Sequence, residues 1–127
     1  MNNEKKKKKK RLKSFTYAFA GLKVAFRDEH NMWIHGTATV CVLVAGALLG
    51  LSAMEWVAVA IVIGMVISAE VVNSALERTA DFVKAERDDR KRDIKDLGAG
   101  AVLVCAIAAA VVGVIIFLPK IVALFVG

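Results

Sequence analysis

The sequence predicts an all-α membrane protein, with one amphipathic helix at the membrane surface followed by three transmembrane helices. Two long stretches, 30–54 and 97–119, contain no Lys, Arg, Asp or Glu. Each exceeds the roughly 20 residues that a membrane-spanning helix needs. A third apolar stretch, 56–78, includes two carboxylates, Glu70 and Glu77. Helices are expected because the backbone must satisfy its own hydrogen bonds in lipid.

The 127 residues are enough for a single domain. Residues 1–11, with the run Lys5–Lys10, are expected to be a disordered basic arm that attracts anionic lipid head groups. Residues 12–29 are expected to form the surface helix, because apolar side chains recur there at steps of three and four. This stripe consists of Leu12, Phe15, Phe19, Leu22 and Phe26. Such a helix lies in the membrane interface or packs on the protein's own cytoplasmic end.

The predicted transmembrane helices are 32–51, 54–79 and 97–118, the last ending at Pro119. The charged segment 82–96 between the second and third helices is expected to be mostly a solvated linker. Of the 18 Lys and Arg residues, all but Lys120 lie in the N-terminal region or around this connection. The positive-inside rule therefore predicts that both regions are cytoplasmic.

The formal net charge of +6 raises the question of nucleic-acid binding. No aromatic residues are interleaved with the lysine run, so no nucleic-acid partner is predicted. The two cysteines, Cys41 and Cys105, fall inside predicted spans and have no neighbours spaced for a zinc site. We expect them to be small packing residues.

Four polar residues in and just after the second span, Glu70, Asn73, Glu77 and Asp81, share one helical face. At 100° per residue they fall within an arc of roughly 80°. A carboxylate at membrane depth costs a few kcal/mol, about 3 on insertion scales. The stripe therefore predicts a functional site. The alternative is a packing role, in which a basic neighbour such as Arg78 neutralises Glu77.

Other charged residues are expected to gather at the same membrane surface, namely Glu29 before the first span and Lys95 and Asp96 before the third. Carboxylate ligands at an interface suit Mg²⁺, which binds one or two carboxylates plus substrate phosphates. The deeper Glu70 suits a general base for a group at head-group depth. Together they predict phosphoryl transfer from a soluble nucleotide to a membrane-embedded alcohol.

Four elements carry a resemblance to a known family. They are Tyr17-x3-Gly21-Leu22, then Glu29 with Asn31 and Ile34-His35, then Glu70-x2-Asn73-Ser74-Ala75-x-Glu77, and Lys95-Asp96-x2-Ala99-Gly100-Ala101-Val102-Leu103. At these residues the sequence resembles the small prokaryotic integral-membrane lipid kinases, which comprise the diacylglycerol and undecaprenol kinases. The resemblance covers residues 11–119.

The resemblance implies a homotrimer in the bacterial inner membrane, with active sites shared between protomers on the cytoplasmic side. Glu70 would be the catalytic base, and Asn73 would position it. Glu29 and Glu77 would hold Mg²⁺. The residues implied to bind ATP are Tyr17, Glu29, Glu77, Asp81, Glu86, Lys95 and Asp96.

The acceptor implied by the resemblance is undecaprenol, with diacylglycerol as the alternative. The stretch Asn31-x2-Ile34-His35 and the ending Phe117-Leu118-Pro119-Lys120 resemble undecaprenol kinases, whereas the diacylglycerol kinases of enteric bacteria carry a Glu where His35 stands. His35 is either a substrate-side group or an interfacial histidine. Lys10 and Arg11 both stand where the family has one basic contact to nucleotide or lipid.

A small proton-coupled transporter is the hypothesis from a different functional class. Glu70 alone would serve such a protein by exchanging protons for substrate. The Lys95-Asp96 pair and the charged segment 82–96 have no evident use in that mechanism.

Overall fold

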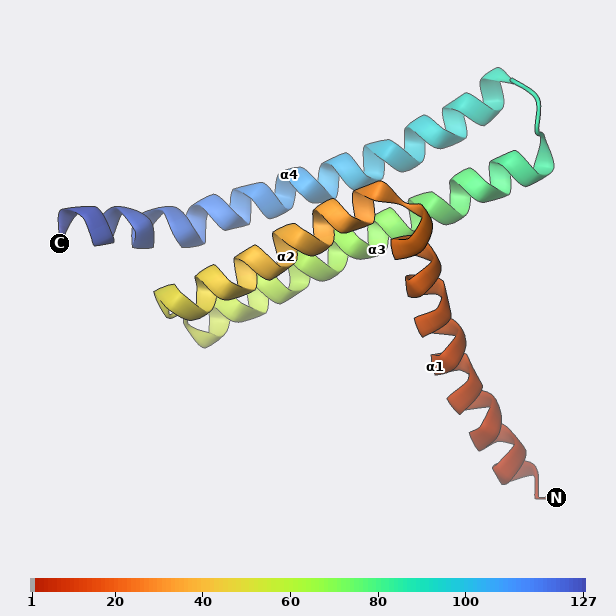
Figure 1. Ribbon diagram of the computed structural model, residues 1–127, viewed down its shortest axis with the longest axis horizontal. Helices are drawn as coiled ribbons and strands as arrows, with labels where there is room; N and C mark the ends of the chain where they lie inside the picture. The colour runs from red at the N-terminus through yellow and green to blue at the C-terminus, as the bar shows by residue number, and fades with distance from the viewer. Residues whose placement is uncertain (1) are drawn as a thin grey trace.

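The computed structural model describes residues 2–127, and this part of the chain forms four α-helices (Figure 1). They are α1 (Asn3–Asp28), α2 (His30–Leu49), α3 (Ala53–Val83) and α4 (Asp89–Val126). The last three run side by side, whereas α1 leaves them at a steep angle. Helices α2, α3 and α4 are each long and apolar enough to cross a membrane. The predicted all-helical class with three possible spans is thus confirmed.

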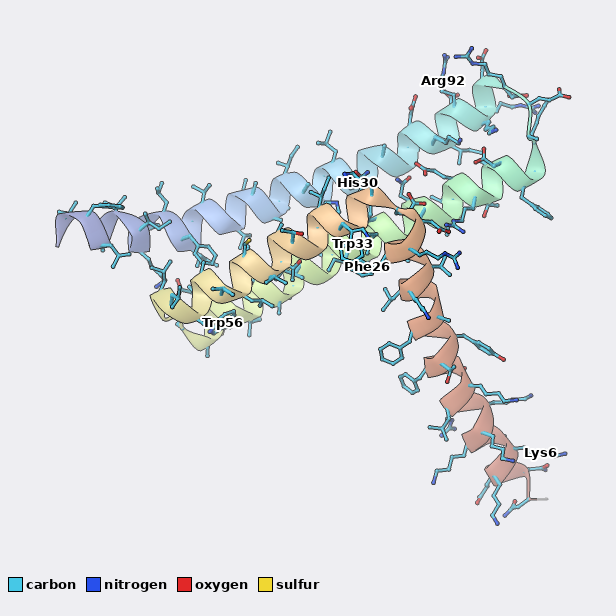
Figure 2. All side chains as sticks on the ribbon, viewed as in Figure 1. Lys6, Phe26, His30, Trp33, Trp56 and Arg92 are labelled. Atoms are coloured by element: carbon cyan, nitrogen blue, oxygen red, sulfur yellow. The ribbon has the colours of Figure 1, made fainter. Side chains whose placement is uncertain are left out.

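The N-terminal arm differs from the prediction, because residues 3–11 are helical rather than disordered. The Asn2 side chain accepts a hydrogen bond from the Glu4 backbone N–H at 3.3 Å, and lysine is a good helix former. Met1 lies outside the described residues. Lys6 marks the end of α1 that is remote from the bundle (Figure 2). The side chains of Leu12, Phe15 and Phe19 are exposed, so the same protomer does not cover this part of the apolar stripe.

The segment 82–96 is also more ordered than predicted. Only residues 84–88 are non-helical, because Asp88 caps α4 by accepting the Arg90 backbone N–H at 2.8 Å. At the other end, α4 continues through Pro119 instead of stopping there. A proline inside a helix removes one backbone hydrogen bond, and transmembrane helices tolerate that loss. The predicted span 97–118 is therefore the middle of a longer helix.

The α2–α3 turn closes the end of the bundle that is remote from α1. Gly50 ends α2 in the left-handed conformation, with φ of 72°, which glycine adopts without strain. Ser52 and Glu55 then form a reciprocal capping box at the start of α3. Trp56, labelled in Figure 2, packs on Gly46, where a side chain would clash with its ring. This small residue lets α2 and α3 approach closely.

Candidate active site

The polar face of α3 changes gradually from buried to exposed. Glu70 and Asn73 retain only 3% and 8% of their accessible surface. Glu77, about 10 Å further along the helix from Glu70, is half-buried, and Asp81 is exposed. Burial by the protein itself therefore decreases along this face from Glu70 to Asp81.

Glu70 faces α2 and meets a single hydrogen-bonding side chain there. The His35 Nε2 atom lies 3.3 Å from Glu70 Oε2. The side chain of Glu70 is 4% exposed and that of His35 is 21% exposed. The structure therefore pairs the predicted base with the histidine whose role the sequence leaves open.

Asn73 links the buried part of the polar face to its half-buried part. Its Nδ2 group donates a hydrogen bond to Glu77 Oε1 at 3.4 Å. Its Oδ1 atom is buried and has no hydrogen-bond partner among the described residues. That oxygen lies against the backbone of Gly98 on α4, where a Cβ atom would clash with it. Asn73 is thus held between Glu77 and the surface of α4.

Arg78 connects the end of α1 to α3. Its Nη2 group donates a hydrogen bond to Asp28 at 2.8 Å and lies 4.0 Å from Glu29. Hydrogen bonds from Arg27 and Arg78 hold the pKa of Asp28 well below its usual range. Arg78 directly follows Glu77, so this contact ties the end of α1 to the part of α3 that carries Glu77. Arg78, which the sequence suggests as a partner for Glu77, pairs with Asp28 instead.

The N-terminal end of α4 supplies cations to the exposed end of the polar face. Asp81 accepts ion pairs from Lys91 at 2.7 Å and from Lys95 at 3.1 Å. Lys95 also lines a hollow of about 780 Å³ at the α3–α4 connection. Its lining carries five cations and two carboxylates, namely Arg87, Arg90, Lys91, Arg92, Lys95, Asp88 and Asp89. A positively charged hollow of this kind attracts phosphate groups.

Within one protomer, the α1 residues predicted to contact nucleotide or lipid lie apart from this cluster. Tyr17 is 69% exposed on α1, and Lys10 and Arg11 are exposed further along the projecting part of that helix. Tyr17 is twelve residues from Glu29, or about 18 Å along a helix. Glu86 is exposed in the connection between α3 and α4, and Asp96 is exposed on α4.

The donor atoms around Glu77 are compatible with Mg²⁺. Glu29, which lies near Arg78, and Glu77 each offer carboxylate oxygens, and both are half-buried. Within residues 2–127, no three His, Cys, Asp or Glu side chains gather to form a metal site by themselves. Mg²⁺ is commonly held by one or two carboxylates together with substrate phosphates, so two protein carboxylates fit it.

An apolar cavity of about 230 Å³ lies between α2, α3 and α4. It extends from His35 past Val66 and Ala109 to Phe117. Among the described residues lining it, His35 is the only ionisable one. One end of the cavity therefore meets the histidine that contacts Glu70, and the rest is suited to hydrocarbon.

Sequence reasoning missed three contributors to this site. The sequence suggests Arg78 only as a partner of Glu77, although it holds the end of α1. Lys91 precedes Lys95 by one helical turn, a spacing that signals a shared face. Gly98 follows the Lys95-Asp96 pair, but its packing on Asn73 has no sequence signal.

Comparisons with known proteins place the chain in a family. Residues 16–117 match the family described as prokaryotic diacylglycerol kinase. The chain belongs to this family. It is 38% identical to an undecaprenol kinase of Bacillus subtilis over 108 residues, which cover 85% of this chain and 88% of that one. It is 39% identical to a diacylglycerol kinase of Synechocystis over 116 residues, which cover 91% of this chain and 66% of that one.

A more distant relative is a diacylglycerol kinase of Escherichia coli K12, which is 28% identical over 100 residues, covering 79% of this chain and 82% of that one. The chain is accordingly a lipid kinase of the prokaryotic diacylglycerol kinase family, with ATP as the phosphoryl donor that a kinase implies. The family assignment supersedes the proton-coupled transporter hypothesis.

Proposed function

We propose that the protein transfers the γ-phosphoryl group of ATP to the hydroxyl of undecaprenol, giving undecaprenyl phosphate, in a Mg²⁺-dependent reaction. The observation that carries the proposal is the buried Glu70 beside His35, where the apolar cavity ends. A carboxylate there meets a hydroxyl whose hydrocarbon chain stays in the membrane. Diacylglycerol is the second candidate acceptor, because relatives of both names match the chain.

Glu70 is the general base of the proposed reaction. It takes the proton of the lipid hydroxyl while the hydroxyl oxygen bonds to the γ-phosphorus and the bond to the ADP oxygen breaks. Asn73 limits the movement of the polar face, because it is bonded to Glu77 and packed on Gly98.

The nucleotide is proposed to bind at the exposed end of the polar face. Lys95 neutralises phosphate charge, Asp81 orients Lys95 through their ion pair, and Asp96 and Glu86 contact the nucleotide from the same end. Glu29 and Glu77 hold Mg²⁺, which when bound offsets the negative charge of the phosphates. Lys10, Arg11 and Tyr17 reach the nucleotide or lipid from α1.

We further propose that the active protein is a homotrimer in the bacterial inner membrane, with its N-terminus in the cytoplasm. The exposed stripe on α1 and the distance of Tyr17 from Glu29 support sites shared between protomers. In such a trimer, α1 of one protomer completes the site of another. The distribution of Lys and Arg supports a cytoplasmic active site.

The proposal is tested by following transfer of label from γ-³²P-ATP into extracted lipid. Purified protein in mixed micelles should label undecaprenol when Mg²⁺ is present and lose this activity when the metal is chelated. Folded protein that labels neither undecaprenol nor diacylglycerol would contradict the proposal. Activity that persists in excess chelator would contradict the metal requirement.

A further inference from the structure

We infer that His35 is the positioning residue for Glu70, holding its carboxylate in place through the Nε2 atom. This inference rests on the proposed role of Glu70 as the base. It concerns a residue that is otherwise open to two interpretations, a direct lipid contact or a histidine that merely lies near the membrane surface.

The first support is the contact itself. Within residues 2–127, the hydrogen-bond partner of Glu70 is His35, at 3.3 Å from Nε2 to Oε2. The backbone N–H groups around Glu70 are used inside α3, so they cannot orient the carboxylate. A glutamate has three side-chain torsions, and a base must be held within hydrogen-bonding reach of its proton. The imidazole is therefore what selects one carboxylate orientation.

The second support is the position of His35 relative to the cavity. The histidine lines the cavity, whereas Glu70 lies behind it and does not. His35 thus stands between the hydrocarbon-lined space and the base. From there it fixes how the carboxylate meets a hydroxyl that arrives from the cavity.

The contact is made by the His35 Nε2 atom, so substitutions can test hydrogen bonding at that position. The amide nitrogen of glutamine can occupy roughly the position of a histidine Nε2 atom, whereas the shorter asparagine cannot reach it. Methionine has a similar length but offers no strong hydrogen bond. The variants His35→Gln, His35→Asn and His35→Met therefore separate hydrogen bonding at this atom from side-chain volume. Thr37→Val, at an exposed position on α2, is the matched control.

The kcat and the KM for each substrate are measured for the four variants with undecaprenol in mixed micelles. His35→Met and His35→Asn should lower kcat roughly 10- to 100-fold, the scale of loss when a catalytic group is misplaced by about 1 Å. Their KM for ATP should stay within about twofold of the wild type, which also reports an intact fold. His35→Gln and Thr37→Val should keep kcat within about threefold.

Three results would overturn the inference. One is a wild-type kcat in His35→Met. Another is a raised KM for lipid with unchanged kcat, which would indicate a direct lipid contact. The third is a His35→Gln variant as impaired as His35→Met. Glu70→Gln is assayed in parallel: if it keeps wild-type kcat, the base assignment and this inference both fail. If Glu70→Gln is inactive while His35→Met is fully active, only the inference fails.

Discussion

The Asn73 side-chain oxygen lies directly against the bare backbone of Gly98, at the point where α3 and α4 meet. The oxygen is buried and has no hydrogen-bond partner among residues 2–127, while the amide nitrogen of the same side chain reaches Glu77. Any side chain at position 98 would occupy the space of the asparagine amide. The geometry of the polar face therefore depends on a residue with no side chain.

Gly98→Ala should displace Asn73 and lower kcat roughly 10- to 100-fold, the scale of a 1 Å misplacement. Overpacking should also destabilise the α3–α4 interface by about 1–3 kcal/mol. Gly100→Ala is the control, because a Cβ atom there meets nothing within 4 Å. Lipid phosphorylation and thermal unfolding in detergent check both effects. A Gly98→Ala protein with wild-type kcat would show that the position of Asn73 does not matter.

Glu70→Gln should abolish turnover while leaving ATP binding intact. Removal of a general base costs roughly 10²- to 10⁴-fold in rate. Glu70 lies about 10 Å from Glu77, so the affinity for nucleotide should change little. Displacement of a fluorescent ATP analogue measures binding, and Glu55→Gln, in the first turn of α3 at the other end of that helix, is the control. Equal losses of ATP affinity and rate would refute the role of base.

Filling the apolar cavity should weaken binding of the lipid and not of ATP. Ala109 lines the cavity, whereas the adjacent Ala110 is exposed on α4. Ala109→Phe should raise the KM for lipid roughly tenfold or more, because a hydrocarbon chain loses several methylene contacts. Ala110→Phe adds the same group to the outer surface and should behave like the wild type. Identical lipid KM values in the two variants would exclude the cavity as the chain-binding site.

The cap at the start of α4 should weaken at acidic pH. Hydrogen bonds from Lys84 and then from Arg90 hold the pKa of Asp88 well below its usual range. A carboxyl whose pKa is lower in the folded state stabilises it above the unfolded pKa of about 3.9. That stabilisation is lost as the pH falls through the folded pKa.

Hydrogen exchange of the first turn of α4, corrected for the intrinsic effect of pH, measures this loss. Protection should be constant from neutral pH to about pH 4 and should decline below it. Asp88→Asn keeps a side-chain oxygen for the cap but cannot ionise, so its protection should not follow the same decline. A decline of equal size in this variant would assign the effect to other groups.

The three possible spans and the polar face of α3 could be predicted from the sequence, and the reasons are physical. Charge-free stretches longer than a membrane span admit few structures, and the spacing of Glu70, Asn73 and Glu77 defines one helical face. The ends of the helices were harder to predict. The charge of segment 82–96 suggested a linker, but the Asp88 cap and the α3–α4 packing extend both helices into it.

The contacts that organise the site were beyond sequence reasoning because they join distant parts of the chain. Arg78 forms its ion pair with Asp28 and not with Glu77, which precedes it in the chain. His35 of α2 contacts Glu70 of α3. Gly98 has a role only because Asn73 packs on it. Such relationships depend on how the helices are rotated against each other. Periodicity identifies a polar face but does not give the residue that it meets.

The acceptor lipid is the central claim, and a competition assay tests it most directly. Undecaprenol and diacylglycerol are supplied at equal mole fractions in the same micelles with γ-³²P-ATP and Mg²⁺, and the two labelled products are separated. The account predicts that undecaprenyl phosphate forms at least about tenfold faster, a difference of roughly 1.4 kcal/mol in transition-state binding. Equal labelling, or a preference for diacylglycerol, would contradict it.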